Sequence, residues 1–418
     1  MSESTSRAAD EHIPRRSPRC PSCGRGEVRE FYRLNQIPAH TVLLLSTVHE
    51  AMNYPKRDLV LAFCECCGFI FNVVFDPTVH EYSSRYEETQ GFSPTFNAFH
   101  SRLAQSLIER YDLHEKNIIE IGCGKGQFLS LLCELGNNTG VGFDPSYIEE
   151  RNNSPAKDRM LFVKDYYSAK YSGCHADFVC CKMTLEHISD PYDFVLHICE
   201  ALLARPDVTV LFQVPNVARI LQEIAFWDIY YEHCSYFSAG SLTRLFEHCG
   251  CEVLDVRTEY GDQYLAIEAR VMNRRPAPLD GREPPLDELR RDVTSFEADS
   301  GRRIALWRHF IVESAGTGAR IALWGGGSKA AGFLSTLNIH DEIRYVVDIN
   351  PYRDDTYIAG TGQRIVAPSF LREYKPSHII VMNPVYNNEV RSDLAGLGLQ
   401  PQVLTVNQTP VRQTVGAN

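Results

Sequence analysis

The segment Ile119-Glu120-Ile121-Gly122-Cys123-Gly124-Lys125-Gly126 decides the fold class of this chain. The apolar run 117–121 is typical of a buried parallel strand, and the apolar spacing of residues 127–134 is typical of a helix. Glycines at such a junction let the backbone approach a ligand closely, and the amino end of the following helix carries partial positive charge. The segment therefore predicts a parallel α/β domain that binds a nucleotide-containing cofactor at this loop.

Acidic residues end the next two predicted strands. Asp144 follows 140–143, where it would accept hydrogen bonds from ribose hydroxyls, and Asp165 is placed to reach an adenine amino group. NAD-dependent dehydrogenases share this arrangement, so a dehydrogenase core is the alternative. The G-x-G-x-G spacing after Glu-Ile, together with residues 177–188, resembles class I S-adenosylmethionine-dependent methyltransferases. That resemblance implies S-adenosylmethionine as cofactor, held by Glu120, Gly122, Gly124, Gly126, Asp144, Asp165, Lys182 and Glu186.

Composition places the chain among globular proteins of two or three domains. It has 418 residues, of which 44% are hydrophobic and 23% charged. The net charge of -11 argues against a nucleic-acid partner, because phosphate binding depends on clustered Lys and Arg. No segment reaches the roughly 18 consecutive apolar residues of a membrane span, and the polar residues 1–18 do not form a secretory signal. We expect a disordered tail at 1–18 and a cytoplasmic protein with no membrane partner.

Turn signals divide the rest of the chain into four tracts. They are a cysteine-bearing module at 19–80, the cofactor core at 81–272, a Pro-rich linker with a connecting helix at 273–317, and a second α/β domain at 318–418. Helical periodicity over residues 286–315 predicts the connecting helix. The sequence assigns no oligomeric state.

Two C-x-x-C pairs, each followed by glycine, occur in the first tract. Two such turns can place four thiolates around one zinc ion, and a site closed by four cysteines is typical of structural rather than catalytic zinc. The alternative is a pair of ordinary loops with reduced cysteines. The predicted zinc ligands are Cys20, Cys23, Cys64 and Cys67.

Residues 226–238 crowd aromatic and titratable side chains together. On chemistry alone, His233 beside Glu232 and two tyrosines fits a proton-transfer site and aromatic packing at a domain interface equally well. The segment resembles the Ile-Tyr-His-Glu-His-x-x-Tyr-Phe signature of sugar C-methyltransferases. Those enzymes also carry an N-terminal C-x-x-C zinc module and a C-terminal Rossmann-like domain. The resemblance extends from about residue 19 to 408.

This resemblance implies an α/β fold with a class I methyltransferase Rossmann-like core, an N-terminal zinc-binding module and a C-terminal Rossmann-like domain. It also implies methylation of a carbon beside the keto group of a nucleotide-linked deoxysugar. His233 would be the base. Tyr231 replaces a family histidine and is expected at the substrate. His187, next to Glu186, is expected to pack at the cofactor's edge. The implied catalytic residues are His233, Tyr230, Glu232 and Tyr86.

The second α/β domain begins with an apolar strand, 319–324, that runs into three glycines. Backbone amides and the side chains of Ser328 and Lys329 would cradle phosphate oxygens there. The strands 344–348 and 378–383 also end in polar residues. The resemblance implies a small-molecule substrate, a nucleotide-linked sugar, held by Gly325, Gly327, Ser328, Lys329, Asp348, Asn350 and Asn383. The alternative is a packing domain whose glycine turn binds nothing.

Two other functions stay open at this point. The same scaffold could methylate oxygen or nitrogen of another natural-product or glycan precursor. It could also be a binding protein that has kept the cofactor fold without catalysing methylation.

Overall fold

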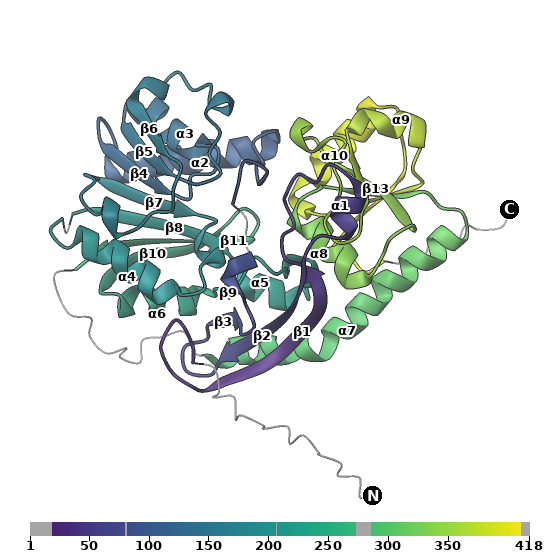
Figure 1. The fold of residues 1–418 in the computed structure, drawn as a ribbon, viewed down its shortest axis with the longest axis horizontal. Coiled ribbons are helices and arrows are strands. Elements are labelled where there is room, and N and C mark those ends of the chain that lie inside the picture. Colours follow the sequence, from purple (N-terminus) through teal and green to yellow (C-terminus); the bar gives the residue numbers. More distant parts are fainter. Residues whose placement is uncertain (1–18, 80–81, 206, 273–285, 411–418) are drawn as a thin grey trace, which may run out of the picture.

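The structure is a computed structural model that describes residues 19–79, 82–205, 207–272 and 286–410. The tail expected at 1–18 and the linker expected at 273–285 lie outside these ranges. Three sheets organise the described chain, one N-terminal, one central and one C-terminal (Figure 1). Within the described ranges, no helix combines the length and apolar character needed to cross a bilayer.

The N-terminal sheet draws strands from two distant parts of the sequence. Its order is β1 (Val28–Pro38), β2 (Lys56–Cys64), β3 (Ile70–Asn72) and β9 (Ser235–Tyr236), with antiparallel pairing throughout. The short helix α1 (Val48–Met52) lies between β1 and β2 in sequence. Because β9 belongs to the aromatic segment 226–238, this pairing fixes that segment against the cysteine-bearing module.

The central sheet has seven strands in the order β10-β11-β8-β7-β4-β5-β6. The strands from β4 to β8 run parallel, and β11 pairs antiparallel with both β8 and β10. Their bounds are β4 (Asn117–Ile121), β5 (Thr139–Phe143), β6 (Met160–Val163), β7 (Phe178–Lys182), β8 (Thr209–Pro215), β10 (Cys251–Glu259) and β11 (Tyr264–Val271). The chain leaves β4 and β7 in opposite directions across the sheet, and ligands bind at such a switch point in parallel α/β folds.

Helices cover both faces of the central sheet. One hydrophobic core joins it to α2 (Pro94–Tyr111) and α3 (Gln127–Gly136), and another joins it to α4 (Pro191–Leu202) and α6 (Ala239–His248). At the start of α2 the Ser93 hydroxyl accepts a hydrogen bond from the Phe96 amide, and Pro94 occupies the first turn. The strand predicted at 117–121 and the helix predicted at 127–134 are confirmed as β4 and α3.

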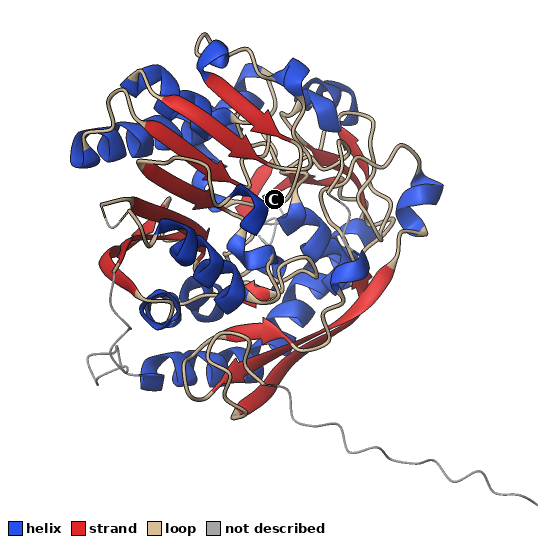
Figure 2. Cartoon of the chain, turned by 60° about the vertical axis from the view of Figure 1, so that its left-hand side comes forward, coloured by secondary structure: helices blue, strands red, loops and turns tan. Residues whose placement is uncertain are grey.

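The predicted connecting helix is confirmed as α7 (Leu286–Gly316). Its first half packs against β1 and α5 (Val217–Gln222), and its second half packs against α8 (Ser328–Leu337), within one continuous core. It runs beside the long strands β1 and β2 in both views (Figure 1, Figure 2). This helix therefore links the N-terminal sheet to the C-terminal one.

The C-terminal sheet is entirely parallel, in the order β14-β13-β12-β15-β16. Its strands are β12 (Ile321–Trp324), β13 (Ile343–Val347), β14 (Arg364–Val366), β15 (His378–Val381) and β16 (Gln402–Thr405), with helices α9 (Leu371–Tyr374) and α10 (Asn387–Gly396) in addition to α8. The chain again reverses direction at β12, so the loop after β12 lies at a second switch point. Short 3-10 helices complete the connections: η1 (Pro77–Val79), η2 (Glu149–Arg151), η3 (Lys157–Arg159), η4 (Ala169–Tyr171), η5 (Leu185–His187), η6 (Phe226–Asp228), η7 (Pro351–Arg353), η8 (Pro368–Phe370) and η9 (Pro384–Tyr386).

Candidate active site

A cavity of about 790 Å³ lies where the carboxyl ends of the central and C-terminal strands face each other. Its wall includes residues 122–125 of the first glycine loop (residues 122–126), residues 325, 327 and 328 of the second glycine loop (residues 325–328), and Tyr230 and His233. Its volume falls within the range of small-molecule sites, roughly 300–1,000 Å³. One cavity therefore joins three sets of residues that are far apart in sequence.

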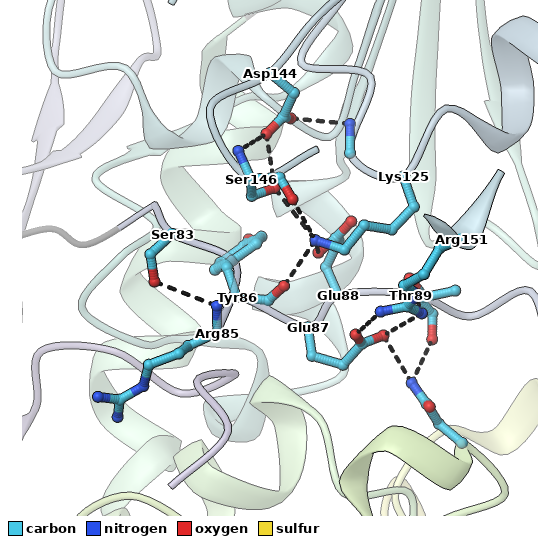
Figure 3. A network of polar contacts seen from close by, with 12 residues as sticks. Ser83, Arg85, Tyr86, Glu87, Glu88, Thr89, Lys125, Asp144, Ser146 and Arg151 are labelled. Carbon is cyan, nitrogen blue, oxygen red and sulfur yellow. Dashed lines mark hydrogen bonds and ion pairs between the residues drawn. The ribbon is translucent and has the colours of Figure 1, made fainter. Parts of the chain in front are cut away.

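The conformation of the first glycine loop is fixed by the carboxylate of Asp144, which follows β5. Gly122 has φ +70°, and a Cβ there would overlap the side chain of Thr184, so only glycine fits. The Gly124 amide donates to Asp144 Oδ2 at 2.9 Å, and the Ser146 amide donates to Asp144 Oδ1 at 2.7 Å (Figure 3). Asp144 thus sets the loop's shape and also faces the cavity.

Two buried ionisable groups lie beneath this loop and line the cavity. Burial raises the pKa of Glu120, whose Oε2 accepts a hydrogen bond from the Leu129 amide at 3.0 Å. Burial lowers the pKa of Lys182, whose Nζ lies 2.9 Å from His100 Nε2. The charges of Glu120 and Lys182 attract each other, which opposes both shifts.

The two other residues predicted near the cofactor differ in position. Asp165 lines the cavity and accepts a hydrogen bond from the Tyr171 hydroxyl at 2.7 Å. Gly126 is not part of the cavity wall, and a Cβ there would lie 2.6 Å from the Phe162 ring. The structure corrects the expectation for Gly126, because its lack of a side chain serves packing of α3 against β6 rather than contact with a ligand.

The second glycine loop repeats the geometry of the first. The Gly326 amide donates to Asp348 Oδ2 at 2.7 Å, and the Asn350 amide donates to Asp348 Oδ1 at 2.8 Å. Asn383, at the end of β15, accepts a hydrogen bond from Gln263 Nε2 at 2.8 Å. All seven residues predicted for the substrate in this domain line the cavity: Gly325, Gly327, Ser328, Lys329, Asp348, Asn350 and Asn383.

A cluster of charges that the sequence did not reveal adjoins the second glycine loop. Lys329 forms an ion pair with Asp228, and Arg219 contacts the other Asp228 oxygen at 3.2 Å. Arg219 also pairs with Glu223 at 2.8 Å. Arg219, Asp228 and Lys329 all line the cavity. Both cations are paired with carboxylates, and burial lowers the pKa of Lys329, so the donors left for an anion here are chiefly the amides at the amino end of α8.

Two of the four residues predicted from segment 226–238, Tyr230 and His233, face the cavity. The ring centroids of Tyr230 and His233 are 4.3 Å apart, and both side chains are buried. Burial raises the pKa of Tyr230 well above its usual value, so its hydroxyl stays protonated and can donate a hydrogen bond.

The other two predicted residues of that segment point elsewhere. Tyr231 does not line the cavity, because its hydroxyl accepts a hydrogen bond from the Asp76 amide at 2.8 Å and its ring packs on Phe75. The prediction that Tyr231 contacts the substrate is therefore wrong. Glu232 is also outside the cavity wall, and its Oε1 accepts hydrogen bonds from the amide and hydroxyl of Thr41. The Glu232 carboxylate therefore does not face the cavity, which disagrees with the predicted direct catalytic contact.

His187, expected at the cofactor's edge, lies beside His233 in the cavity wall. A ring nitrogen of His187, a ring nitrogen of His233 and a carboxylate oxygen of Glu186 lie within 4.8 Å of one another. All three side chains line the cavity. The position of residues 186–187 directly after β7, beside the switch point of the central sheet, is the sequence signal that could have indicated this.

The segment 82–90 contacts both the central and the C-terminal domain, and the polar contacts of Glu87 are drawn in Figure 3. Tyr86 lines it, and burial raises the pKa of the Tyr86 hydroxyl well above its usual value. The Glu87 carboxylate is 1% exposed, pairs with Arg151 of the central domain, and accepts a hydrogen bond from Asn350 Nδ2 at 2.8 Å. Arg353 donates to the Glu87 carbonyl oxygen and to that of Gly326. Glu87 thereby ties the cofactor side of the cavity to the second glycine loop.

The four predicted zinc ligands converge in the N-terminal module. Their sulfurs lie within 4.8 Å of one another, with Cys20 and Cys67 3.6 Å apart and Cys23 and Cys64 3.7 Å apart. Four thiolates at about 2.3 Å from a tetrahedral zinc ion would be about 3.8 Å apart. The donor set and spacing are therefore compatible with zinc. Cys66 lies outside this cluster.

The chain matches two protein families over different parts of its length. Residues 96–256 match the family described as "Methyltransferase domain", and residues 290–400 match "C-methyltransferase C-terminal domain". Among curated proteins, it is similar to C-methyltransferase NovU of Streptomyces niveus, at 28% identity over 313 residues. That match covers 69% of this chain and 71% of NovU.

Solved methyltransferase structures show more distant likeness. An O-methyltransferase family protein from Burkholderia thailandensis is 16% identical, with a TM-score of 0.34, over 42% of this chain and 58% of that one. Magnesium protoporphyrin IX methyltransferase from Synechocystis PCC 6803, with bound S-adenosylhomocysteine, is 15% identical, with a TM-score of 0.33, over 44% of this chain and 90% of that one.

The first glycine loop at a switch point and the family match over 96–256 define the class: the chain is a class I S-adenosylmethionine-dependent methyltransferase. The match over 290–400 and the relationship to NovU then place it among the C-methyltransferases.

Proposed function

We propose that this enzyme methylates a carbon next to the keto group of a nucleotide-linked 4-keto-deoxysugar. The shared cavity carries the proposal, because residues of the first glycine loop, the Tyr230 and His233 pair, and residues of the second glycine loop all line it. The methyl donor, the base and an anionic substrate would therefore lie next to one another in this cavity.

The first glycine loop fits S-adenosylmethionine by its chemistry. Gly122 and Gly124 line the cavity with bare backbone, and Asp144 and Asp165, which also line it, would present carboxylates to ribose and adenine. Glu120 and Lys182 lie beneath the first glycine loop in the cavity wall. When bound, S-adenosylmethionine supplies an electrophilic methyl group on a positively charged sulfur.

The second glycine loop is the proposed seat of the substrate's diphosphate and nucleotide. Amides at the amino end of α8 together with Ser328 would donate to phosphate oxygens, and Lys329 would supply charge. Asp348, Asn350 and Asn383 lie at the ends of neighbouring strands, where a nucleoside could reach them. The match between the Gly326–Asp348 and Gly124–Asp144 contacts supports a second nucleotide site.

The chemistry at the sugar requires a base and a hydrogen-bond donor. His233 would remove a proton from the carbon beside the ketone, and the electron pair of that C–H bond would move to the keto oxygen. Tyr230, and Tyr86 across the cavity, can donate hydrogen bonds to the negative oxygen. Methyl transfer then forms a carbon–carbon bond while the carbon–sulfur bond breaks. Glu232, outside the cavity wall, would position the segment that carries His233 through its hydrogen bonds with Thr41.

The N-terminal module, expected at residues 19–80, would hold one structural zinc ion through Cys20, Cys23, Cys64 and Cys67. A closed four-cysteine site leaves no position for substrate, so its contribution would be to folding. Because β9 is the outer strand of the same sheet, zinc binding would also stabilise the segment that carries His233. The domains at 81–272 and 318–418 would hold cofactor and substrate respectively.

Mass spectrometry of the purified enzyme with S-adenosylmethionine and a panel of nucleotide 4-keto-deoxysugars tests this proposal. In deuterated water without cofactor, the substrate should exchange the hydrogen beside its ketone. With cofactor, it should gain the mass of one methyl group. Methylation without any exchange would contradict carbon methylation, and would instead indicate transfer to oxygen or nitrogen.

A further inference from the structure

Glu186 is a buried acid in the wall of the cavity. It follows β7 within the 3-10 helix η5, and only 1% of its surface is exposed. One of its carboxylate oxygens lies within 4.8 Å of ring nitrogens of both His187 and His233. By contrast, the acids that shape the first glycine loop are Glu120 and Asp144. The geometry thus places Glu186 beside the proposed base rather than among the loop's own contacts.

Neither carboxyl oxygen of Glu186 has a hydrogen-bond partner among the residues that the structure describes. Buried polar atoms in native proteins nearly always have partners, so such a group in a cavity wall is available to a water molecule or a ligand in the cavity. Burial raises the pKa of Glu186 to about 8, and no neighbouring cation opposes this shift. At neutral pH the carboxyl therefore carries a proton that it can donate.

We propose that Glu186 is a catalytic residue that donates a hydrogen bond from its protonated carboxyl to the keto oxygen of the substrate while His233 removes the neighbouring proton. This assignment rests on the proposed function. The donor makes the carbon more acidic, because it stabilises the charge that develops on oxygen. Buried carboxylic acids kept neutral in this way are known oxyanion donors.

The proton and electron balance is complete without a further reactant. His233 takes the proton from carbon, and the C–H electron pair becomes the C=C bond of an enolate whose oxygen bonds to the Glu186 proton. The enolate carbon then attacks the methyl group, the C–S electrons return to sulfur, and the ketone re-forms. Glu186 keeps its proton, and His233 releases the proton that it took to solvent.

Several titratable groups face Glu186 from neighbouring elements, and they bear on any pH dependence. The tyrosines and cysteines among them have pKa values raised by burial, so they remain neutral near pH 7. These groups are His187 on the same turn, His233, Tyr230 and Cys234 on the reactive segment, Tyr82 on the bridging segment, Cys181 on β7 and Tyr264 on β11.

Two variants separate a proton donor from a carboxylate base. Glu186→Ala removes the donor and should lower kcat by about 10²-fold or more, the usual loss for one oxyanion donor. Glu186→Gln keeps an N–H donor and should lose less, about tenfold. The wild-type rate should fall as pH rises through about 8, and Glu186→Gln should lack that alkaline limb. Glu200→Gln, an exposed site on α4, serves as the matched control and should leave kcat unchanged.

A measurement without substrate keeps this proposal separate from the proposed function. Infrared difference spectra of wild type and Glu186→Gln at neutral pH should show the C=O stretch of a protonated carboxyl in wild type alone. Absence of that band would overturn the role of Glu186, even if the enzyme methylates a sugar. Inactivity of wild type on every keto sugar would instead contradict the proposed function.

Other results would also overturn the role of Glu186. One is an equal loss of kcat in Glu186→Gln and Glu186→Ala, with the alkaline fall in rate kept in Glu186→Gln. Another is full activity in Glu186→Ala. A third is a metal ion, counted by elemental analysis, that wild type holds and Glu186→Gln loses. The last result would make the Glu186, His187 and His233 cluster a metal site.

Discussion

His187 Nδ1 lies 3.0 Å from the backbone carbonyl oxygen of Glu232. Because a carbonyl oxygen can only accept, Nδ1 carries the proton, and a neutral ring then leaves Nε2 as the acceptor. The His187 and His233 rings are nearly perpendicular, with centroids 4.8 Å apart. The carbonyl group of Glu232 thus orients the His187 ring, and the next residue in the chain is His233.

Replacement of His233 by alanine tests the base. We expect turnover to fall by about 10²- to 10⁴-fold, the usual contribution of a general base. Affinity for S-adenosylmethionine, measured by calorimetry, should change little because the first glycine loop is untouched. Full activity in His233→Ala would exclude this residue as the base and direct attention to His187.

Zinc removal tests the link between the N-terminal module and the reactive segment. Cys64→Ser should lose the metal ion and lower the thermal midpoint, because structural zinc contributes directly to folding. Since β3 pairs with β9, activity should decline with it. Cys66→Ser is the control, because Cys66 lies outside the four-sulfur cluster. Elemental analysis that finds equal zinc in wild type and Cys64→Ser would contradict the site.

Glu87→Ala tests the connection between the two glycine loops. It leaves Arg151 and Asn350 without their shared carboxylate, and breaking a buried ion pair typically costs about 3–5 kcal/mol of unfolding free energy. Glu50→Ala breaks the exposed pair with Arg85 and should cost about 1 kcal/mol or less. Urea denaturation compares the two. Equal losses would mean that Glu87 does not hold the lobes together.

Glu232→Gln tests whether burial keeps the Glu232 carboxyl protonated in the folded protein. Burial raises the pKa of Glu232 to about 7, above its unfolded value near 4.5. A raised folded pKa gives a stabilising contribution that is complete below pH 4.5 and is lost as pH rises toward 7. Glutamine cannot ionise, so the variant's thermal midpoint should depend less on pH in this window. Parallel curves for the two proteins would show that Glu232 is ionised in the fold.

Local pattern was sufficient to predict much of the fold. Apolar runs next to glycines predicted the strands β4 and β12 and the helices after them, because strand burial and left-handed glycine turns are properties of a few adjacent residues. The cysteine cluster followed from spacing alone. The long helix α7 followed from its periodicity.

The errors arose where distant segments meet. Nothing in residues 235–236 signals that they extend the N-terminal sheet, yet that pairing turns Tyr231 toward Phe75 and Asp76 and away from the cavity. The roles of Glu87 and Asp228 were missed for a related reason. Their partners are supplied by Arg151, Asn350 and Lys329, and side-chain contacts over such separations leave no periodic signal in the sequence.

Two-dimensional NMR of the product formed with ¹³C-methyl-labelled S-adenosylmethionine tests methyl transfer to carbon directly. We expect a labelled methyl group bonded to a ring carbon next to the ketone position of the sugar. A labelled methyl group bonded to oxygen or nitrogen would contradict it.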